Sequence, residues 1–296
     1  MLRIAVPNKG SLAEVAAEML AEAGYTGRRD PKDLHVIDPS NDVEFFYLRP
    51  RDIATYVGAG ALDVGITGRD LLLDVRSKAR EIENLGFGDS TFRFAGEPGR
   101  FSELGDLEGL RVATSYPGLV EDFLVSHGVT AELVQLDGAV ESAVRLGVAD
   151  AVADVVSTGT TLRQAGLEIF GPVILQSQAV MIGAPNDAEG TETFLRRLRG
   201  VMVAHRYVMV DYDLPVELLD AATDVSPGVE SPTVSPLRDP AWVAVRVMIP
   251  RKGVSLVMDD LYALGARAIL VTALHAALLW ARDARHLPCD PVSRCR

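Results

Sequence analysis

The segment Ala151-Val152-Ala153-Asp154-Val155-Val156-Ser157-Thr158-Gly159-Thr160-Thr161-Leu162 decides the fold class. A mainly apolar run ends in a turn of small hydroxyl residues around one glycine, and a helical pattern follows. This succession predicts a buried strand, a tight turn and a helix. Strand, turn and helix in repeated order are typical of α/β proteins with parallel sheets.

The same rhythm runs through residues 1–204. Residues 2–6 predict a buried strand, and residues 12–23 predict a helix that Ser11 caps, with Glu14 completing a capping box. Further strands are predicted at residues 43–48, 64–67, 111–114, 132–136, 151–156 and 178–182. Further helices are predicted at residues 50–58, 71–75, 117–127, 139–146 and 194–204.

These elements predict two α/β lobes with strands crossing between them, a periplasmic-binding-protein-like core. Lobe I is expected to comprise residues 1–93 and 179–210, and lobe II residues 94–178. A cleft between two such lobes is a usual place for a ligand.

The pattern changes near residue 211. Strands are predicted at residues 207–212, 242–249 and 268–273, and helices at residues 216–222 and 254–264. A loop rich in Pro, Ser and Gly occupies residues 226–236. The order βαββαβ, with one strand left unassigned, predicts a ferredoxin-like (ACT-like) α+β domain over residues 211–275.

Composition narrows the classes of partner. The 296 residues carry a net charge of −12, and an acidic surface repels nucleic acid and anionic membranes. No apolar run reaches transmembrane length, and the five histidines have no metal-ligand spacing. The two cysteines, Cys289 and Cys295, lie near the C-terminus, so a reducing cytoplasm is the expected compartment.

The turn after residue 156 is a candidate phosphate site. Unpaired N–H groups at a helix start, together with the helix dipole, favour an anion. Hydroxyl donors and a glycine that permits close approach surround it, namely Ser157, Thr158, Gly159, Thr160 and Thr161. Asp154 is placed to bind ribose hydroxyls or magnesium. An ordinary N-cap with a surface Asp154 explains the segment equally well, and the lysine of a Walker motif is missing.

Other strand ends carry further candidates. Lys9 follows the first strand, where it would bind a polyphosphate or remain a solvated turn residue. Arg69 and Asp70 follow the strand at residues 64–67. Arg69 fits a phosphate, and Asp70 would be either an N-cap, which is favoured, or a ligand contact. Tyr116 is expected either to line the cleft or to pack in the core.

Arg49 and Arg51 flank Pro50 at another predicted helix start. A cation in the first turn opposes the helix dipole, which hints at a ligand for Arg51. A solvated face is the favoured interpretation for Arg51, and Arg49 is the better candidate for binding.

Four segments together resemble the ATP phosphoribosyltransferase family. They are Ala5-Val6-Pro7-Asn8-Lys9-Gly10, Asp63-Val64-Gly65-Ile66-Thr67-Gly68-Arg69-Asp70, Thr114-Ser115-Tyr116-Pro117 and Asp154-Val155-Val156-Ser157-Thr158-Gly159-Thr160-Thr161-Leu162. Pro227-Gly228-Val229-Glu230-Ser231-Pro232-Thr233-Val234-Ser235-Pro236-Leu237 resembles the regulatory domain of the long, histidine-inhibited form. The resemblance covers residues 1–275, whereas the tail at residues 276–296 does not look like the family.

The resemblance implies an enzyme that joins ATP and phosphoribosyl pyrophosphate, with Mg²⁺ on the pyrophosphate. Ser157, Thr158, Gly159, Thr160 and Thr161 would hold the donor's 5′-phosphate, and Asp154 its ribose. The ATP and pyrophosphate end would comprise Lys9, Arg49, Arg69, Asp70 and Tyr116, with Lys9 and Asp154 as the catalytic candidates. Inhibitory histidine would lie near Asp213, Ser231, Thr233 and Ala268. The family also implies dimers that assemble into hexamers.

Two other functions would share this architecture. A solute-binding protein without catalysis has the same lobes and cleft, but such proteins are usually exported, and residues 1–12 have no export signal. A catalytically silent histidine sensor would keep the third domain.

Overall fold

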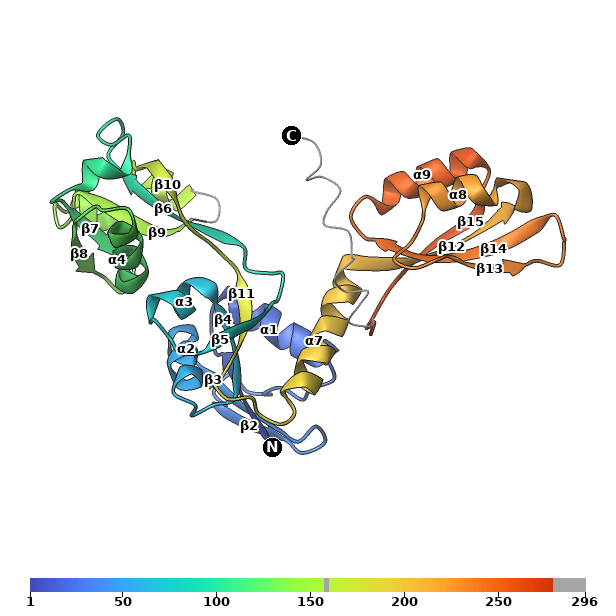
Figure 1. Ribbon diagram of the computed structural model, residues 1–296, viewed down its shortest axis with the longest axis horizontal. Coiled ribbons are helices and arrows are strands. Elements are labelled where there is room, and N and C mark those ends of the chain that lie inside the picture. Colours follow the sequence, from blue (N-terminus) through green and yellow to red (C-terminus); the bar gives the residue numbers. More distant parts are fainter. Residues whose placement is uncertain (157–159, 279–296) are drawn as a thin grey trace. The chain divides into compact units, whose positions relative to one another are not determined.

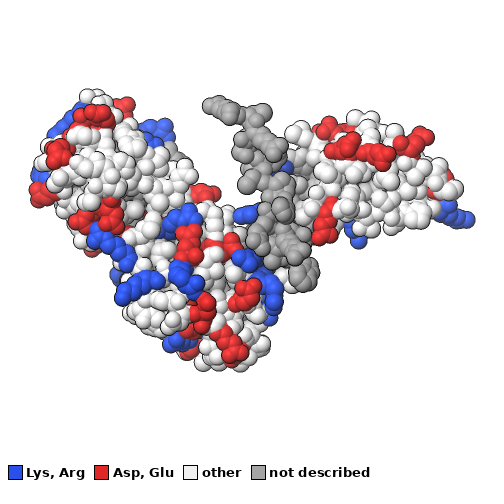
Figure 2. Space-filling model, viewed as in Figure 1, with Lys and Arg blue, Asp and Glu red and all other residues white. Residues whose placement is uncertain are grey.

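The computed structural model describes residues 1–156 and 160–278 (Figure 1). The chain divides into two compact units, Met1–Glu192 and Thr193–Arg296. Within the described residues, no helix is long and apolar enough to cross a membrane. Acidic and basic side chains are interspersed over the viewed face of the N-terminal unit (Figure 2).

The first sheet of the N-terminal unit has the order β2-β3-β1-β4-β11-β5. Its strands are β1 (Leu2–Pro7), β2 (His35–Asp38), β3 (Val43–Leu48), β4 (Val64–Gly68), β5 (Arg80–Asn84) and β11 (Ala179–Gly183). β1 pairs in parallel with β3 and β4, whereas β2, β5 and β11 pair antiparallel. The helices of this lobe are α1 (Ser11–Glu22), α2 (Pro50–Gly58) and α3 (Arg69–Asp74).

Helix α2 packs directly on the centre of this sheet. Its buried side chains Ile53 and Val57 join the core formed with β1 and β11. A Cβ atom on Gly65 of β4 would lie 2.6 Å from Ile53 Cγ2, so the close approach of α2 requires glycine there.

The second sheet has the order β10-β6-β9-β7-β8. Its strands are β6 (Ser90–Gly96), β7 (Arg111–Thr114), β8 (Glu132–Gln135), β9 (Ala151–Val156) and β10 (Glu168–Ser177). β7 pairs in parallel with β8 and β9, whereas β6 and β10 are antiparallel. The helices are α4 (Pro117–Ser126), α5 (Ser142–Arg145), α6 (Thr160–Gln164) and a 3₁₀ turn, η1 (Leu104–Leu107). The β5–β6 and β10–β11 connections join the two sheets, which confirms the predicted two-lobed α/β core.

Two local predictions are wrong. Gly10, with φ 82°, is the N-cap of α1, and no side chain caps this helix. The helix therefore already includes Ser11, and the predicted capping box does not form. The helix predicted at residues 139–146 is reduced to α5, because Gly138 and Ala139 both have positive φ and cannot begin a right-handed helix.

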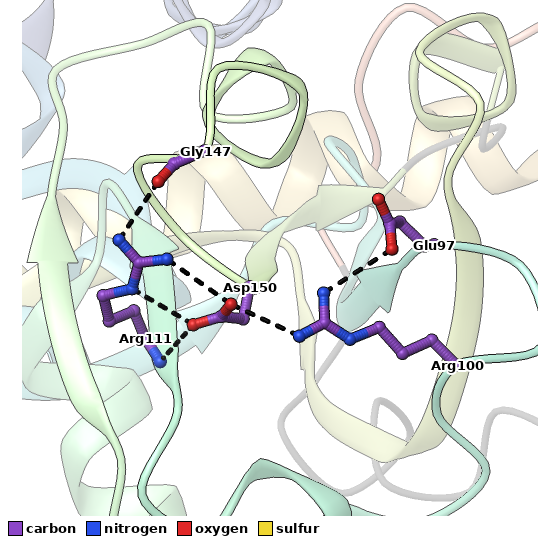
Figure 3. A network of polar contacts seen from close by, with 5 residues as sticks. All are labelled: Glu97, Arg100, Arg111, Gly147 and Asp150. Carbon is purple, nitrogen blue, oxygen red and sulfur yellow. Dashed lines mark hydrogen bonds and ion pairs between the residues drawn. The ribbon is translucent and has the colours of Figure 1, made fainter.

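Asp150 fixes the beginning of β9 (Figure 3). The backbone N–H and Nε of Arg111 each donate to Asp150 Oδ2 at 3.1 Å, and Arg100 Nη2 donates to Asp150 Oδ1 at 3.3 Å. Hydrogen bonding from Arg111 is the largest cause that lowers the pKa of Asp150. Asp154 lies four residues further on, inside the strand.

Helix α7 (Thr191–Arg206) belongs to the C-terminal unit except for its first two residues, and a ferredoxin-like domain follows it. Its elements are β12 (Tyr207–Pro215), η2 (Val216–Leu218), α8 (Leu219–Val225), β13 (Thr233–Pro236), β14 (Trp242–Pro250), α9 (Val254–Leu264) and β15 (Arg267–Ala273). The antiparallel sheet has the order β13-β14-β12-β15, and α8 and α9 cover one face (Figure 1). β13, inside the predicted loop, is the strand that completes βαββαβ.

Candidate functional site

Three strand ends of the N-terminal unit bring together Asp70, Tyr116 and Asp154. Asp70 follows β4, Tyr116 follows β7, and Asp154 lies near the end of β9. Asp70 and Asp154 both lie near enough to the Tyr116 hydroxyl to act on its pKa. Burial raises the pKa of Tyr116 far above its usual range, and the charges of Asp70 and Asp154 raise it further. The hydroxyl therefore stays protonated and can donate.

Asp154 is a half-buried carboxylate near the end of β9. Burial raises its pKa, and the negative charges of Glu141 and Asp70 add to this rise. The N–H of Val155 donates to its Oδ1 at 2.8 Å and opposes the rise. A ligand that supplies hydroxyl donors or positive charge would stabilise the ionised form of this carboxylate further.

Ser177, at the end of β10, holds Asp70 in place. Ser177 Oγ donates to Asp70 Oδ1 at 2.7 Å and accepts from the Asp70 N–H at 3.1 Å. Both residues are buried. The N-cap of α3 is Gly68, which lacks a side-chain cap, so the favoured interpretation of Asp70 as a local cap is wrong.

Tyr116 shows the core packing that was one of its two expected roles, whereas its place in the ligand cleft stays a prediction. Its ring packs edge-on against Phe92 at 5.1 Å between centroids and joins the core of lobe II. Its hydroxyl, in contrast, faces Asp70. The sequence alone could not reveal the packing of Tyr116 against Phe92, because Phe92 belongs to β6, a strand that was not predicted.

The predicted phosphate loop is described only in part. Ser157, Thr158 and Gly159 lie outside the described residues. Thr160 and Thr161 begin α6 with exposed side chains, and buried Leu162 anchors this helix to the lobe.

The cations predicted near the site differ in their partners. Arg69 makes two hydrogen bonds to Glu81, at 2.9 and 2.5 Å, which raise the pKa of its guanidinium. Arg69 also borders a cavity of about 400 Å³ beside the strands that connect the sheets. Lys9 and Arg49 are exposed, and neither forms an ion pair with another described residue. They are the cations available to a phosphate.

Arg51 is not part of a solvated face, so the favoured interpretation of this residue is wrong. It forms an ion pair with Asp74, whose side chain is only 2% exposed, and its Nη2 donates to the Ser115 carbonyl oxygen at 2.5 Å. The partners lie on α3 and after β7, far along the chain from α2.

Sequence reasoning missed Asp74, Glu141 and Ser177. Asp74 ends the apolar run Leu71-Leu72-Leu73, and a lone acid in such a run is a signal of a buried ion pair. Glu141 follows an Asp-Gly turn after β8, a strand end like the others. Ser177 has no local signal, since its partner Asp70 lies 107 residues away.

The candidate histidine-binding residues do not form one cluster within the chain. Asp213 and Ala268 lie on the paired strands β12 and β15 beside a bulge, where Ala268 has φ 49°. Thr233 pairs with Arg246 of β14, and Ser231 precedes β13. Strands lie about 4.8 Å apart, so β13 lies about 10 Å from β12.

Family comparison agrees with this architecture. The ATP phosphoribosyltransferase family model matches residues 49–200, and the model of the family's C-terminal domain matches residues 204–276. An ATP phosphoribosyltransferase of Paenarthrobacter aurescens is 61% identical over 283 residues, covering 93% of this chain and 99% of its own. One of Streptomyces avermitilis is 60% identical and covers 94% and 100%.

A solved structure extends the likeness to three dimensions. The ATP phosphoribosyltransferase (HisG:HisZ) complex from Thermotoga maritima has a TM-score of 0.60 and 28% identity, covering 67% of this chain and 97% of that chain. With the lobes, the strand-end residues and the C-terminal domain in place, the chain belongs to the ATP phosphoribosyltransferase family, in its long form, and is a pentosyltransferase of histidine biosynthesis.

Proposed function

We propose that the chain condenses ATP with 5-phosphoribosyl 1-pyrophosphate. N1 of the adenine attacks the anomeric carbon, the bond from that carbon to the pyrophosphate oxygen breaks, and N1-(5-phosphoribosyl)-ATP forms. The adenine amino group releases one proton to balance the reaction. The observation that carries the proposal is the meeting of Asp70, Tyr116 and Asp154 from strand ends of both lobes.

The donor is assigned to lobe II. The turn with Ser157, Thr158, Gly159, Thr160 and Thr161 would bind the 5′-phosphate at the start of α6. Asp154, whose pKa burial raises, would accept hydrogen bonds from the ribose hydroxyls. Its negative charge would also stabilise positive charge that develops on the ribose ring as pyrophosphate leaves.

The nucleotide is assigned to lobe I and to the Tyr116 turn. Lys9 and Arg49, exposed and without described ion-pair partners, would bind phosphate oxygens of ATP or of the leaving pyrophosphate. Tyr116 and Asp70 would fix the adenosine portion, with Arg69 beside them. Positioning two anionic substrates in one cleft supplies much of the rate enhancement in such a reaction.

Magnesium fits this scheme as an ion carried by the pyrophosphate. The described part of the chain, which leaves out residues 157–159 and 279–296, contains no group of three His, Cys, Asp or Glu side chains arranged for a metal. Magnesium commonly uses one or two protein carboxylates together with substrate phosphates. Asp154 and Asp70 are the carboxylates at hand, and the bound ion would neutralise charge on the leaving group.

The C-terminal unit is proposed to inhibit the enzyme when it binds histidine. Asp213 would pair with the histidine amino group and Ala268 would supply backbone groups from the bulge. Ser231 and Thr233 would contribute from the region of β13. We expect a cytoplasmic homo-oligomer of dimers that form hexamers.

Release of pyrophosphate tests the proposed reaction. The full chain with ATP, phosphoribosyl pyrophosphate and magnesium should release pyrophosphate, and added histidine should slow it. Histidine binding without turnover, over a range of pH and metal concentrations, would instead favour a silent sensor. Absence of both activities would favour a solute-binding protein.

A further inference from the structure

Helix α4 is capped by a residue of the other lobe. Its own N-cap, Tyr116, makes no side-chain capping bond. Instead, the Leu119 N–H in its first turn donates to Oδ1 of Asp74, at the end of α3, at 3.2 Å. An acidic side chain at a helix N-terminus also complements the helix dipole. The contact therefore ties lobe II to lobe I through a buried carboxylate.

Gly118 permits this contact. A Cβ atom at residue 118 would lie far closer to the Asp74 carbonyl oxygen than van der Waals contact allows. Gly118 has no positive φ, so it is this close approach, rather than backbone conformation, that excludes a larger residue. Any side chain there would push α3 and α4 apart.

Arg51 completes the contact and extends it to the candidate site. One guanidinium nitrogen pairs with Asp74, another donates to the Ser115 carbonyl, and the guanidinium carbon lies 5.1 Å from the centre of the Tyr116 ring. The three partners of Arg51 thus include both residues of the turn between β7 and α4. This turn carries the hydroxyl that faces Asp70.

The same two helices have a second, exposed tie. Arg76, just after α3, pairs with Glu121 and Asp122 of α4, and its side chain is 53% exposed. Exposed ion pairs contribute little to stability. Arg76 therefore provides a matched comparison, because it links the same helices without contacting Tyr116.

We propose that Arg51 is a positioning residue that, with Asp74, sets the Tyr116 turn against lobe I and so shapes the nucleotide side of the cleft. Its guanidinium is used by Asp74, Ser115 and Tyr116, and it acts on the substrate only through Tyr116. This inference rests on the proposed function, which places the nucleotide next to Tyr116. Because the proposed donor site lies at a separate loop of lobe II, Arg51→Gln should weaken ATP binding and leave donor binding unchanged.

Four variants of the full chain test this role. Arg51→Gln removes the charge, Arg51→Lys keeps a charge but cannot bridge Asp74 and Ser115 with one planar group, and Gly118→Ala wedges the helices apart without changing charge. Arg76→Gln is the control. Arg76 has a positive φ, but arginine and glutamine tolerate this backbone conformation alike, so the exchange adds no backbone strain. The measurements are KM for ATP, kcat, calorimetric Kd for ATP and for phosphoribosyl pyrophosphate, and hydrogen exchange at the Leu119 amide.

We expect Arg51→Gln and Gly118→Ala to raise KM and Kd for ATP about tenfold, the effect of losing one charge-assisted hydrogen bond. Leu119 should exchange faster in both, donor Kd should stay unchanged, and Arg51→Lys should recover part of the loss. Arg76→Gln should resemble the unchanged chain. Equal weakening of both substrates, or ATP affinity unchanged in both variants, would refute the positioning role. Absence of turnover in the unchanged chain would refute the proposed function, and the two Kd values with Leu119 exchange would still decide the role of Arg51.

Discussion

Replacing Asp154 with asparagine should raise the stability of the Met1–Glu192 unit and nearly abolish turnover. Burial, together with Glu141 and Asp70, raises the pKa of this carboxyl in the folded chain. Deprotonation is therefore harder in the folded state than in the unfolded state. The resulting destabilisation is fully present at pH values above the folded pKa and disappears as pH falls through it towards the unfolded value. Asparagine lacks this destabilisation at every pH.

The expected gain in the free energy of unfolding depends on which contacts of Asp154 an asparagine can still make. Its amide oxygen can still accept the Val155 N–H, so the hydrogen bond at 2.8 Å need not be lost. A fully buried unpaired charge destabilises by several kcal/mol, but Asp154 is only partly buried, so we expect a gain of about 1 kcal/mol. This corresponds to a rise in Tm of about 2–4 °C for a unit of this size. We expect kcat to fall by about 10²–10³-fold, the scale for losing one group that stabilises transition-state charge.

Asp150→Asn is the matched control, because Asp150 directly precedes β9 and Asp154 lies within the same strand. Hydrogen bonds from Arg111 lower the pKa of Asp150, so its stabilisation is present above the unfolded pKa and is lost as pH falls through the folded value. Its side chain is 19% exposed, so we expect a loss of about 1 kcal/mol, with kinetics unchanged. Thermal unfolding at pH 7 and pyrophosphate release measure both variants. A lower Tm for Asp154→Asn would show that the carboxylate is structural, and unchanged kcat would refute its role at the ribose.

Three further perturbations have defined outcomes. Gly65→Ala should destabilise the N-terminal unit by about 1–3 kcal/mol in urea unfolding, since its methyl group would overlap Ile53; a stability equal to that of the unchanged chain would show that α2 can shift freely. Lowering the pH below about 4 should destabilise the chain, because Asp150 and Asp63 then become protonated and lose their partners. Arg3 holds the pKa of Asp63 below its usual range despite burial. Urea unfolding at several pH values should therefore show a weaker dependence of the free energy of unfolding on pH in Arg3→Gln. Asp213→Ala should raise the histidine concentration that halves turnover by about tenfold or more, as expected for losing a charged hydrogen bond; an unchanged value would remove Asp213 from the regulatory site.

How far the fold follows from sequence differs between buried and edge strands. β3, β7 and β9 begin and end where they were predicted, because apolar and β-branched residues fill them and turns bound them. β2 and β5 were missed because they are polar edge strands, HVID and REIEN, whose pairing comes from the neighbouring strand rather than from their own pattern. β10 was missed because an irregular register between Phe170 and Val173 interrupts its alternation.

For the candidate site, the sequence predicts the positions of the residues but not their contacts. Parallel strands expose their carboxyl ends at one edge, so the sequence could locate Asp70, Tyr116 and Asp154 at or near strand ends. It could not pair them, because their contacts join residues far apart, as Leu119 and Asp74 are, 45 positions from each other. Their roles in binding substrates stay predictions.

The four cations that the sequence suggested for phosphate binding differ in whether they already form an ion pair, and not in where they lie along the chain. Lys9, Arg49, Arg51 and Arg69 all lie where a strand ends or a helix starts. Arg51 is bound to buried Asp74, and Arg69 would have to leave Glu81 to reach a ligand. Lys9 and Arg49 have no such contact to break within the described chain, so their binding to phosphate carries no added cost. We therefore expect Lys9→Ala and Arg49→Ala to weaken phosphate binding directly, whereas changes at Arg51 act through Tyr116.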